Sequence, residues 1–323
     1  MNLNTNQMIA CGANHTAVIT EDGRVVCWGN NDHSQCKVPA DLENVVSVCC
    51  GSYFTAALTA DGKVICWGDC SYYISKDFNY KNISSGDYHL SAVTTEGRVI
   101  YSGTNILNQC DVPRDLENVV SVCCGDYCTA ALTAYGKVIC WGHNEFNQCD
   151  VPHDLENVSA ICIADTKICA LTAEGRVTSW GDDRPDNSER VLIDMPNIIN
   201  AVSIVSGGFH FAALTSEGQV VCWGHNEFDQ CNIPPDLSNV VAISCGTHHT
   251  VALTSEGQVV CWGDLDKCNF PKNLKNVVSI CCGYNHTAAV TTEGCVVCWG
   301  NNQYWKCVVP KGIVARTGMV VLM

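Results

Sequence analysis

Cysteine is the residue type most able to do chemistry in this sequence, because 25 of the 323 residues are cysteines. A zinc site needs two closely spaced ligand pairs that converge on one ion. The spacing Cys-x-x-Cys occurs only at Cys295 and Cys298. Both lie in a predicted strand, where residues three apart point to opposite faces. Zinc binding is therefore not expected, and the sequence predicts no metal and no cofactor.

Disulfides within a repeated unit are a second chemistry that the cysteines allow. Four pairs lie nine residues apart, and a fifth pair, Cys261 and Cys268, lies seven apart. The four pairs are Cys27 and Cys36, Cys140 and Cys149, Cys222 and Cys231, and Cys298 and Cys307. Cys110 has Tyr101 in place of its partner, and Cys66 lacks the partner nine residues on. With no secretory signal to indicate an oxidising compartment, we interpret the cysteines mainly as buried free thiols, with disulfides as the alternative.

Histidines recur at one equivalent position, where a ring of imidazoles could form a metal or proton site. They are His15, His89, His210, His249 and His286. Three sister copies carry Phe54, Cys128 and Lys167 there, and phenylalanine in particular favours a role in packing and turn hydrogen bonds. No nucleophile elbow, phosphate loop or dinucleotide fingerprint is present. We therefore predict no catalytic residue and no enzyme activity.

The elements that position these residues come from a repeat of about 39 residues. A pair of an acidic residue, once tyrosine, and glycine recurs eight times, from Asp22-Gly23 to Glu293-Gly294. Five residues after seven of these glycines stands a tryptophan followed by glycine; only the third copy differs, with Tyr101-Ser102-Gly103. The tryptophans, which we interpret as packing between repeats, are Trp28, Trp67, Trp141, Trp180, Trp223, Trp262 and Trp299.

Each repeat is predicted to form at least three antiparallel strands. In the second copy, short apolar runs at 45–49, 55–59 and 64–67 are separated by turns, one of them at Asp61-Gly62. An Asp-Gly pair between apolar runs is typical of a tight hairpin. Segments such as 35–39 could add a short outer strand. No amphipathic helical pattern occurs, so the fold is predicted to be all-β.

Small meanders of this length cannot bury both faces alone, so they stack into propellers or solenoids. Residues 313–323 are apolar and strand-like, and pairing with the first repeat near 7–11 would remove an exposed edge. The sequence therefore predicts one closed β-propeller domain of eight blades, with seven as the alternative. The predicted repeats are 6–40, 41–79, 80–114, 115–153, 154–196, 197–235, 236–272 and 273–310, with 311–323 as a closing strand.

Two motifs resemble the regulator of chromosome condensation repeat. One is Trp-Gly-x-Asn followed by Gln and an apolar residue, as in the segments 28–36, 141–149 and 223–231. The other is Gly-x-x-His-Thr after small residues, as in 9–19, 243–253 and 280–290. The resemblance covers essentially the whole chain and implies a β-propeller. Short, cysteine-rich repeats of this kind resemble copies found in giant viruses and some protists.

Composition limits the partners. The net charge is −15 and only 18 residues are Lys or Arg, without a basic cluster. Nucleic-acid binding depends on such residues, so neither nucleic acid nor an anionic membrane is expected, whereas a partner protein with a basic surface is. No signal peptide or membrane helix is visible, and we expect an intracellular monomer, cytoplasmic or nuclear.

Departures from the repeat are the expected sites of partner binding, because shared positions build the frame. The candidates are Tyr72, Tyr73, Phe78, Tyr80, Arg184, Asp186, Glu189, Arg190, Phe146, Phe228, Tyr304 and Trp305. The expected function is a non-catalytic protein-interaction scaffold. The resemblance also implies two alternatives: a guanine nucleotide exchange factor for a small GTPase, or a chromatin-associated adaptor.

Overall fold

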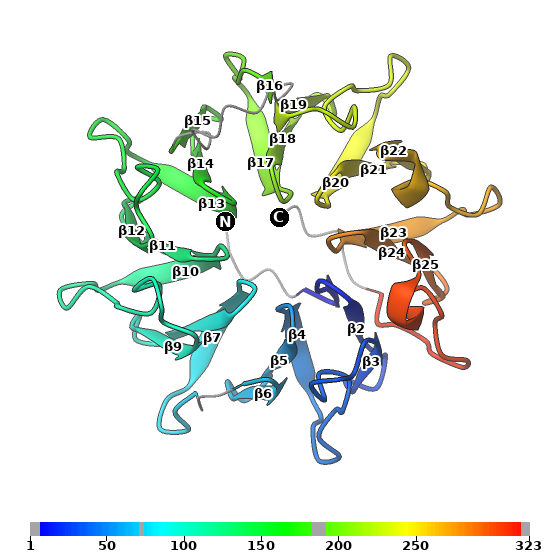
Figure 1. The fold of residues 1–323 in the computed structure, drawn as a ribbon, viewed down its shortest axis with the longest axis horizontal. Coiled ribbons are helices and arrows are strands. Elements are labelled where there is room, and N and C mark those ends of the chain that lie inside the picture. The colour runs from blue at the N-terminus through cyan, green and yellow to red at the C-terminus, as the bar shows by residue number, and fades with distance from the viewer. Residues whose placement is uncertain (1–6, 71–73, 182–191, 318–323) are drawn as a thin grey trace.

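The computed structural model describes residues 7–70, 74–181 and 192–317 of the chain. Eight antiparallel sheets surround a central axis as the blades of a propeller (Figure 1). The all-β fold and the eight blades predicted from the sequence are thereby confirmed. Two 3₁₀ turns, η1 (Leu265–Lys267) and η2 (Gln303–Trp305), are the only helical segments in the described residues. No helix in this part of the chain has the length and apolar character needed to cross a membrane.

The blades follow one another in sequence order. Blade 1 contains β1 (Ile9–Cys11), β2 (His15–Ile19) and β3 (Val25–Gly29); blade 2 contains β4 (Val45–Cys50), β5 (Phe54–Thr59) and β6 (Val64–Gly68); blade 3 contains β7 (Tyr80–Ser85), β8 (His89–Thr94) and β9 (Val99–Gly103); blade 4 contains β10 (Val119–Cys124), β11 (Cys128–Thr133) and β12 (Val138–Gly142). Blade 5 contains β13 (Val158–Ala164), β14 (Lys167–Thr172) and β15 (Val177–Trp180); blade 6 contains β16 (Leu192–Ile193), β17 (Ala201–Ser206), β18 (His210–Thr215) and β19 (Val220–His225); blade 7 contains β20 (Val240–Cys245), β21 (His249–Thr254) and β22 (Val259–Gly263); blade 8 contains β23 (Val277–Cys282), β24 (His286–Thr291) and β25 (Val296–Gly300).

Glycine is required at two turns of the repeat. In the hairpin between β5 and β6, Gly62 has a φ of 76° and its N–H donates to the carbonyl of Thr59. Positive φ strains residues that carry a Cβ, which explains the acidic-Gly pairs. In the turn before β2, a Cβ on Gly12 would lie 2.4 Å from the carbonyl oxygen of Gly51 in blade 2. Gly12 therefore lets blades 1 and 2 approach each other closely.

In seven of the eight blades, the described residues form no outer strand after Trp-Gly. Segment 35–39 instead forms turns, in which Lys37 N–H donates to the carbonyl of Ser34 and Val38 N–H to that of Cys36. In the same turn, the side chains of Gln35 and Asn31 accept hydrogen bonds from the N–H groups of His33 and Cys36. A fourth strand occurs in the described residues only in blade 6, where β16 pairs with β19.

Buried histidines join neighbouring blades. Nε2 of each lies 2.8–2.9 Å from the hydroxyl of a threonine in the next blade. The pairs are His286 with Thr16, His15 with Thr55, His89 with Thr129, His210 with Thr250, and His249 with Thr287. In the joint between blades 1 and 2, the Thr55 hydroxyl donates to the carbonyl of Gln35 at 2.9 Å. Since a hydroxyl carries one proton, His15 must donate from Nε2. Burial lowers the pKa of His15 to about 4, so its imidazole is neutral at pH 7.

Tryptophan completes these joints. The indole N–H of Trp67 donates to the same Gln35 carbonyl at 2.9 Å. Equivalent bonds run from Trp28 to Lys306, from Trp141 to Gln109 and from Trp180 to Gln148. Trp223, Trp262 and Trp299 are equally buried, but their indole N–H groups have no hydrogen-bond partner among the residues that the structure describes. Each tryptophan thus packs a blade against the chain that links it to its neighbour.

Where the histidine is replaced, the threonine is replaced with it. Phe54 of blade 2 meets Leu90 of blade 3 in one buried cluster, and Cys128 of blade 4 meets Ile168 of blade 5 in another. At the third such joint, Lys167 replaces the histidine, and Phe211 of blade 6 replaces the threonine and stacks on Trp223 at 5.5 Å. A lone buried donor or acceptor is costly, so both members of a joint change together.

The C-terminal segment closes the ring by completing blade 1. Ala315 forms an antiparallel bridge with Thr20, and its N–H donates to the carbonyl of Gly294 in blade 8. In blade 2, Val45 occupies the equivalent position, paired with Thr59. The closing strand expected over 311–323 is thus a single bridge in the described residues up to 317. It lies beside Thr20 rather than along 7–11, because Met8 already accepts the N–H of Ile19.

His15 and Thr55 can be replaced by the apolar pair that occupies the same positions between blades 2 and 3. This replacement tests whether the two residues stabilise the fold as a pair. We expect His15→Phe alone and Thr55→Leu alone each to lower the free energy of unfolding by about 1–3 kcal/mol, because each leaves a buried polar group without its partner. The double variant, which copies Phe54 and Leu90, should recover at least half of the summed loss. Urea unfolding of the four proteins measures this coupling. Strictly additive losses would contradict it.

Acid should weaken the ring through His15, His210 and His249. Burial lowers the pKa of His15 and His249 to about 4, and the pKa of His210 to about 3. Unfolded histidine titrates near 6.5, so the unfolded chain binds protons first and stability falls as pH drops from about 6.5 towards 4. Each such histidine should contribute up to about 1.4 kcal/mol per pH unit. Unfolding midpoints from pH 7.5 to 4.5 check this, and His15→Phe/Thr55→Leu should show a shallower decline.

Candidate protein-binding face

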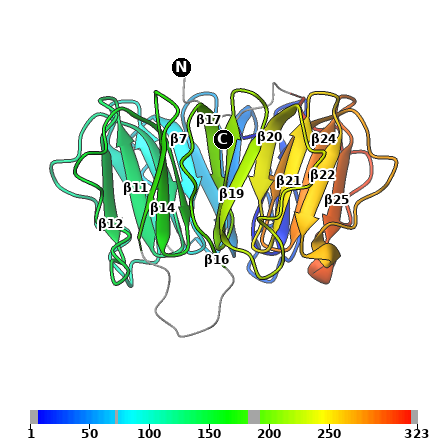
Figure 2. The same ribbon diagram turned by 90° about the horizontal axis from the view of Figure 1, so that it is seen from above.

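The propeller has two unlike faces. In a three-stranded meander, the turn between the first and second strands and the end of the third strand emerge on the same side. We call this side the turn face; it carries the inner turns (Gly-x-x-His) and the outer turns that follow Trp-Gly. The 3₁₀ turns η1 and η2 project from it, on the lower side of Figure 2. The opposite side, with the acidic-Gly hairpins, is called the hairpin face.

The outer turns are held by their own side chains. In the turn after β12, Asn144 Oδ1 accepts from the N–H of Cys149 at 2.7 Å, and Gln148 Oε1 accepts from the N–H of Phe146 at 3.0 Å. The Cys149 thiol donates to the carbonyl of His143 at 3.3 Å. Asn31, Asn105, Asn226 and Asn302 bond their cysteines in the same way. The Trp-Gly-x-Asn…Gln-Cys motif is therefore a framework that presents the residue at the Phe146 position.

The cysteines divide into two groups. The structure joins Cys66 to Cys70 and Cys261 to Cys268 by disulfides, and the other 21 are free. The interpretation as free thiols thus applies to most of them, whereas it is wrong for these four. None of the pairs nine residues apart is bonded, because Cys36 and its equivalents turn towards a backbone carbonyl instead. The bond to Cys70 was missed because this repeat lacks the usual linker.

Cysteine and serine line the central channel, a cavity of about 370 Å³ between the first strands of the blades. The cysteines in its wall are Cys11, Cys49, Cys50, Cys123, Cys162, Cys245, Cys281 and Cys282. Burial raises the pKa of the Cys49 and Cys282 thiols to about 12, so they remain protonated and weakly nucleophilic. Nowhere in the described ranges do three or more His, Cys, Asp or Glu side chains form a group placed to hold a metal ion.

Three tyrosines form an arc on the turn face. Tyr53, Tyr88 and Tyr127 occupy the same inner-turn position in blades 2, 3 and 4 and are 39%, 37% and 38% exposed. Their ring centroids lie 6.4 and 6.1 Å apart. His33 continues the arc at one end, 4.6 Å from Tyr53, and His143 at the other, 6.4 Å from Tyr127. The sequence analysis missed this arc, although aligning the repeats on Gly-x-x-His brings the three tyrosines into one column.

A second aromatic cluster lies across the same face in blades 6 and 7. Phe209 stacks on His248 at 5.8 Å, and Phe228 lies 4.5 Å from His248. His225 packs against all three rings, and its Nε2 lies 3.3 Å from a carboxylate oxygen of Glu227. Phe228, a partner-binding candidate from the sequence, therefore belongs to this aromatic cluster on the turn face.

The other predicted binding residues fall into different environments. Phe146 packs on His143, and Tyr304 and Trp305 lie in η2, with Trp305 74% exposed. Tyr80 is buried in β7, where its hydroxyl donates to the carbonyl of Ser75, and Phe78 packs against the same core. Tyr80 therefore has no surface for a partner, because it fills the gap left by the shortened linker. Tyr72, Tyr73, Arg184, Asp186, Glu189 and Arg190 lie outside the described residues.

An acidic residue and a tyrosine meet across the axis. Burial raises the pKa of Asp87 in blade 3, whereas hydrogen bonds from Tyr284 of blade 8 and from Ser52 of blade 2 act to lower it. Burial and the nearby carboxylates of Asp87 and Asp126 raise the pKa of Tyr284. Blades 1 and 2 stand between these two blades in the ring (Figure 1). The inner turns of blades 2, 3 and 8 thus come together over the end of the channel.

Cations are distributed unevenly between the two faces. Five hairpins carry a cation directly after the glycine, namely Arg24, Lys63, Arg98, Lys137 and Arg176. In the described inner and outer turns, up to the Gln position, the cations are Lys167, Lys267 and Lys306. Lys267 pairs with Asp264 at 3.4 Å, and Lys306 is buried with its ammonium 2.7 Å from Asn14. The turn face therefore combines exposed aromatic rings with carboxylates that few cations offset.

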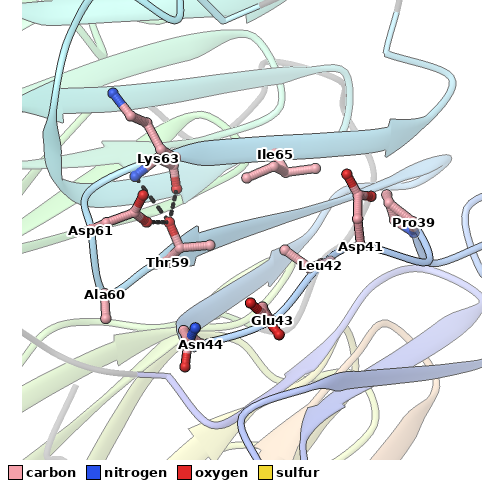
Figure 3. A pocket seen from close by; sticks show the side chains of 10 residues that line it. All are labelled: Pro39, Asp41, Leu42, Glu43, Asn44, Thr59, Ala60, Asp61, Lys63 and Ile65. Atoms are coloured by element: carbon pink, nitrogen blue, oxygen red, sulfur yellow. Dashed lines mark hydrogen bonds between the residues drawn. The ribbon is translucent and has the colours of Figure 1, made fainter.

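Shallow crevices on the hairpin face recur from blade to blade. One is lined by Pro39, Leu42, Asp61 and Lys63, and its hairpin is held by the Thr59 hydroxyl (Figure 3). Equivalent crevices in blades 7 and 8 have volumes of about 260 and 410 Å³, against about 360 Å³ here. Because the same repeat positions line each one, they follow from the blade geometry and distinguish no single site.

The fold and the turn face together define a closed, eight-bladed β-propeller built from one repeated meander. The family model "Regulator of chromosome condensation (RCC1) repeat" matches residues 9–35, 45–73, 119–148, 201–230, 240–268 and 277–304. These segments make up more than half of the chain. The chain therefore belongs to the regulator of chromosome condensation (RCC1) repeat family.

Solved structures support the fold. The CRINKLY WD40 ectodomain of the receptor kinase ACR4 from Arabidopsis thaliana is 21% identical, with a TM-score of 0.61, over 82% of this chain and 98% of that one. Human WBSCR16 is 20% identical, with a TM-score of 0.58, over 88% and 86%. At these identities the likeness concerns the fold alone. No curated protein sequence matches the chain.

Removing the hydroxyl of Tyr284 tests the contact between Tyr284 and Asp87. We expect Tyr284→Phe to raise the pKa of Asp87 further, because the lost hydrogen bond acts to lower that pKa against burial. Carboxyl NMR titration of Asp87 in both proteins measures the shift. Tyr304→Phe, in an outer turn, is the matched control and should leave the pKa of Asp87 unchanged. An unchanged value in Tyr284→Phe would contradict the contact.

Proposed function

We propose that this chain is a non-catalytic scaffold that binds partner proteins through its turn face. The observation that carries the proposal is the arc of Tyr53, Tyr88 and Tyr127. At the same position, blades 1, 5 and 8 carry the small polar residues Asn14, Thr166 and Asn285. The turn therefore does not need an aromatic ring, and three exposed rings in succession are not explained by folding. Aromatic residues of this kind are enriched where proteins bind one another.

Other features of the turn face support the same function. The joints and the hydrogen bonds of the outer turns fix the backbone of the turn face. Binding a partner therefore costs little conformational entropy. Phe228, Tyr304 and Trp305 extend the apolar surface towards the outer edge. His15 is buried with its pKa lowered to about 4, and the Cys49 and Cys282 thiols are protonated, so these groups are poor acids, bases or nucleophiles at neutral pH.

Capture experiments with face-specific variants test the proposal. The full chain is immobilised and exposed to a lysate of its native cells, together with the turn-face variant Phe228→Ala/Trp305→Ala, the arc variant Tyr88→Ala/Tyr127→Ala, and the hairpin-face variant Tyr135→Ala/Lys63→Ala. Tyr135 is 79% exposed on the hairpin face and serves as the aromatic control. We expect at least one turn-face variant to lose partners that the hairpin-face variant retains.

Two outcomes would refute the proposal. In one, the wild type retains no protein above the level of an unrelated propeller. In the other, only the hairpin-face variant loses its partners. Melting temperatures of all variants show whether a loss reflects binding or unfolding, since exposed side chains contribute little to stability.

A further inference from the structure

Among the described residues, disulfides occur in the outer turns that lack the usual side-chain framework. In five blades, an asparagine three residues after the tryptophan position accepts the N–H of the turn cysteine at 2.7–2.9 Å, and that cysteine is a free thiol. Blades 2 and 7 have Cys70 and Leu265 at this position instead. In these two blades the turn cysteine is bonded to a strand cysteine, as Cys66–Cys70 and Cys261–Cys268. A covalent bond thus takes the place of the asparagine hydrogen bond.

The disulfide of blade 7 joins the outer turn to the edge of the blade. Cys268 follows η1, which projects from the turn face (Figure 2), and Cys261 belongs to β22. Cys261 packs against the buried cluster between blades 7 and 8. Both cysteines are half-buried, and among the described residues this blade has no fourth strand outside β22. A small thiol can therefore reach the bond from solvent.

The rest of this turn is held mainly by bonds within itself. The N–H groups of residues 266–268 donate to Asp264 and Leu265, and the Lys267 ammonium lies 3.4 Å from the Asp264 carboxylate. The turn meets the blade where the N–H of Asp264 donates to the carbonyl of His248 at 2.9 Å. Opening the disulfide would leave that anchor at the start of the turn and remove the covalent tie at its end.

We propose that Cys261–Cys268 is a reversible modification site, at which a dithiol reductant opens the disulfide and loosens the outer turn of blade 7 while the propeller stays folded. One thiolate of the dithiol attacks Sγ of Cys268, because Cys261 is packed against the core. The S–S bond breaks, and the Cys261 sulfur leaves as a thiolate and takes up a proton. The second thiol of the reductant then displaces Cys268, which is protonated in turn. The dithiol supplies both electrons and becomes a cyclic disulfide.

The propeller is expected to tolerate this step. The two cysteines are only seven residues apart, and a cross-link over a short loop constrains the unfolded chain less than one over a long loop. The equivalent turn of blade 4 is held without a disulfide, since Cys149 is a free thiol. Reduction should therefore change the order of the turn that presents Leu265, which is 84% exposed, and not the fold. The inference goes beyond the proposed function, because the turn responds with or without a partner.

Differential alkylation of the full chain tests the chemistry. Protein purified without reductant is treated with iodoacetamide, then with dithiothreitol, and then with isotope-labelled iodoacetamide, and the peptides are assigned by mass spectrometry. We expect Cys261 and Cys268 to carry only the second label, in protein whose circular dichroism is unchanged by dithiothreitol. Replacing dithiothreitol by oxidised glutathione before the second alkylation should restore their protection, which shows that the bond is reversible.

Amide hydrogen exchange measures the loosened turn. We expect exchange over 265–268 to become at least about tenfold faster on reduction. In Cys268→Ser it should be fast with and without dithiothreitol. The matched control is Cys149→Ser in blade 4, where a hydroxyl can keep the hydrogen bond that the thiol donates to the carbonyl of His143. Exchange in the outer turn of this control should be the same in both redox states.

Three results would each overturn the inference. In the first, Cys261 and Cys268 are alkylated before any dithiothreitol is added, so the bond does not form. In the second, dithiothreitol opens the bond only under conditions that also unfold the chain. In the third, exchange over 265–268 is equal in the oxidised and reduced proteins. None of these measurements involves a partner, so the scaffold function stands or falls separately.

Discussion

The buried joint between neighbouring blades is the interaction on which the structure depends. Histidine of one blade, threonine of the next and the carbonyl of the linker form one hydrogen-bonded chain, and tryptophan donates to the same carbonyl. In the joint between blades 1 and 2, His15 and Thr55 do not reach water, so their polar groups depend on partners within the ring. A single blade therefore cannot satisfy its own polar groups. The hydrogen bonds of one joint can form only when the blades on both sides of it are folded.

The joints also determine which positions of the repeat are constrained and which can vary. Where histidine gives way to Phe54 or Cys128, the threonine position changes to Leu90 or Ile168, and the joint stays buried. The residue just before the histidine position has no such constraint. It varies from Asn14 to Tyr53 to Asn285 without altering the turn. A rigid frame thus presents a column of independently variable side chains, which is where recognition can change without loss of the fold.

Ring closure gives this frame its two different faces. The C-terminal segment occupies the first position of blade 1, so the closing contact lies at the hairpin end of that blade, beside Thr20. The inner turns on the opposite side are left to converge on the axis, where Tyr284 meets Asp87. The hairpin face carries both acidic residues and cations beside its glycines, whereas few cations lie in the described turns of the other face.

The sequence by itself determined what is local or periodic: the strands, the acidic-Gly hairpins, the recurring tryptophans and histidines, and the number of blades. These follow from side-chain alternation and turn chemistry within about 39 residues. Only the tertiary structure decided that Tyr80 is buried, that Cys66 bonds Cys70, that Tyr53, Tyr88 and Tyr127 form one row, and that Tyr284 reaches Asp87. Such contacts depend on the curvature of the closed ring and on local departures from the repeat. A repeat period fixes which positions are equivalent, but it does not fix how far apart their side chains lie.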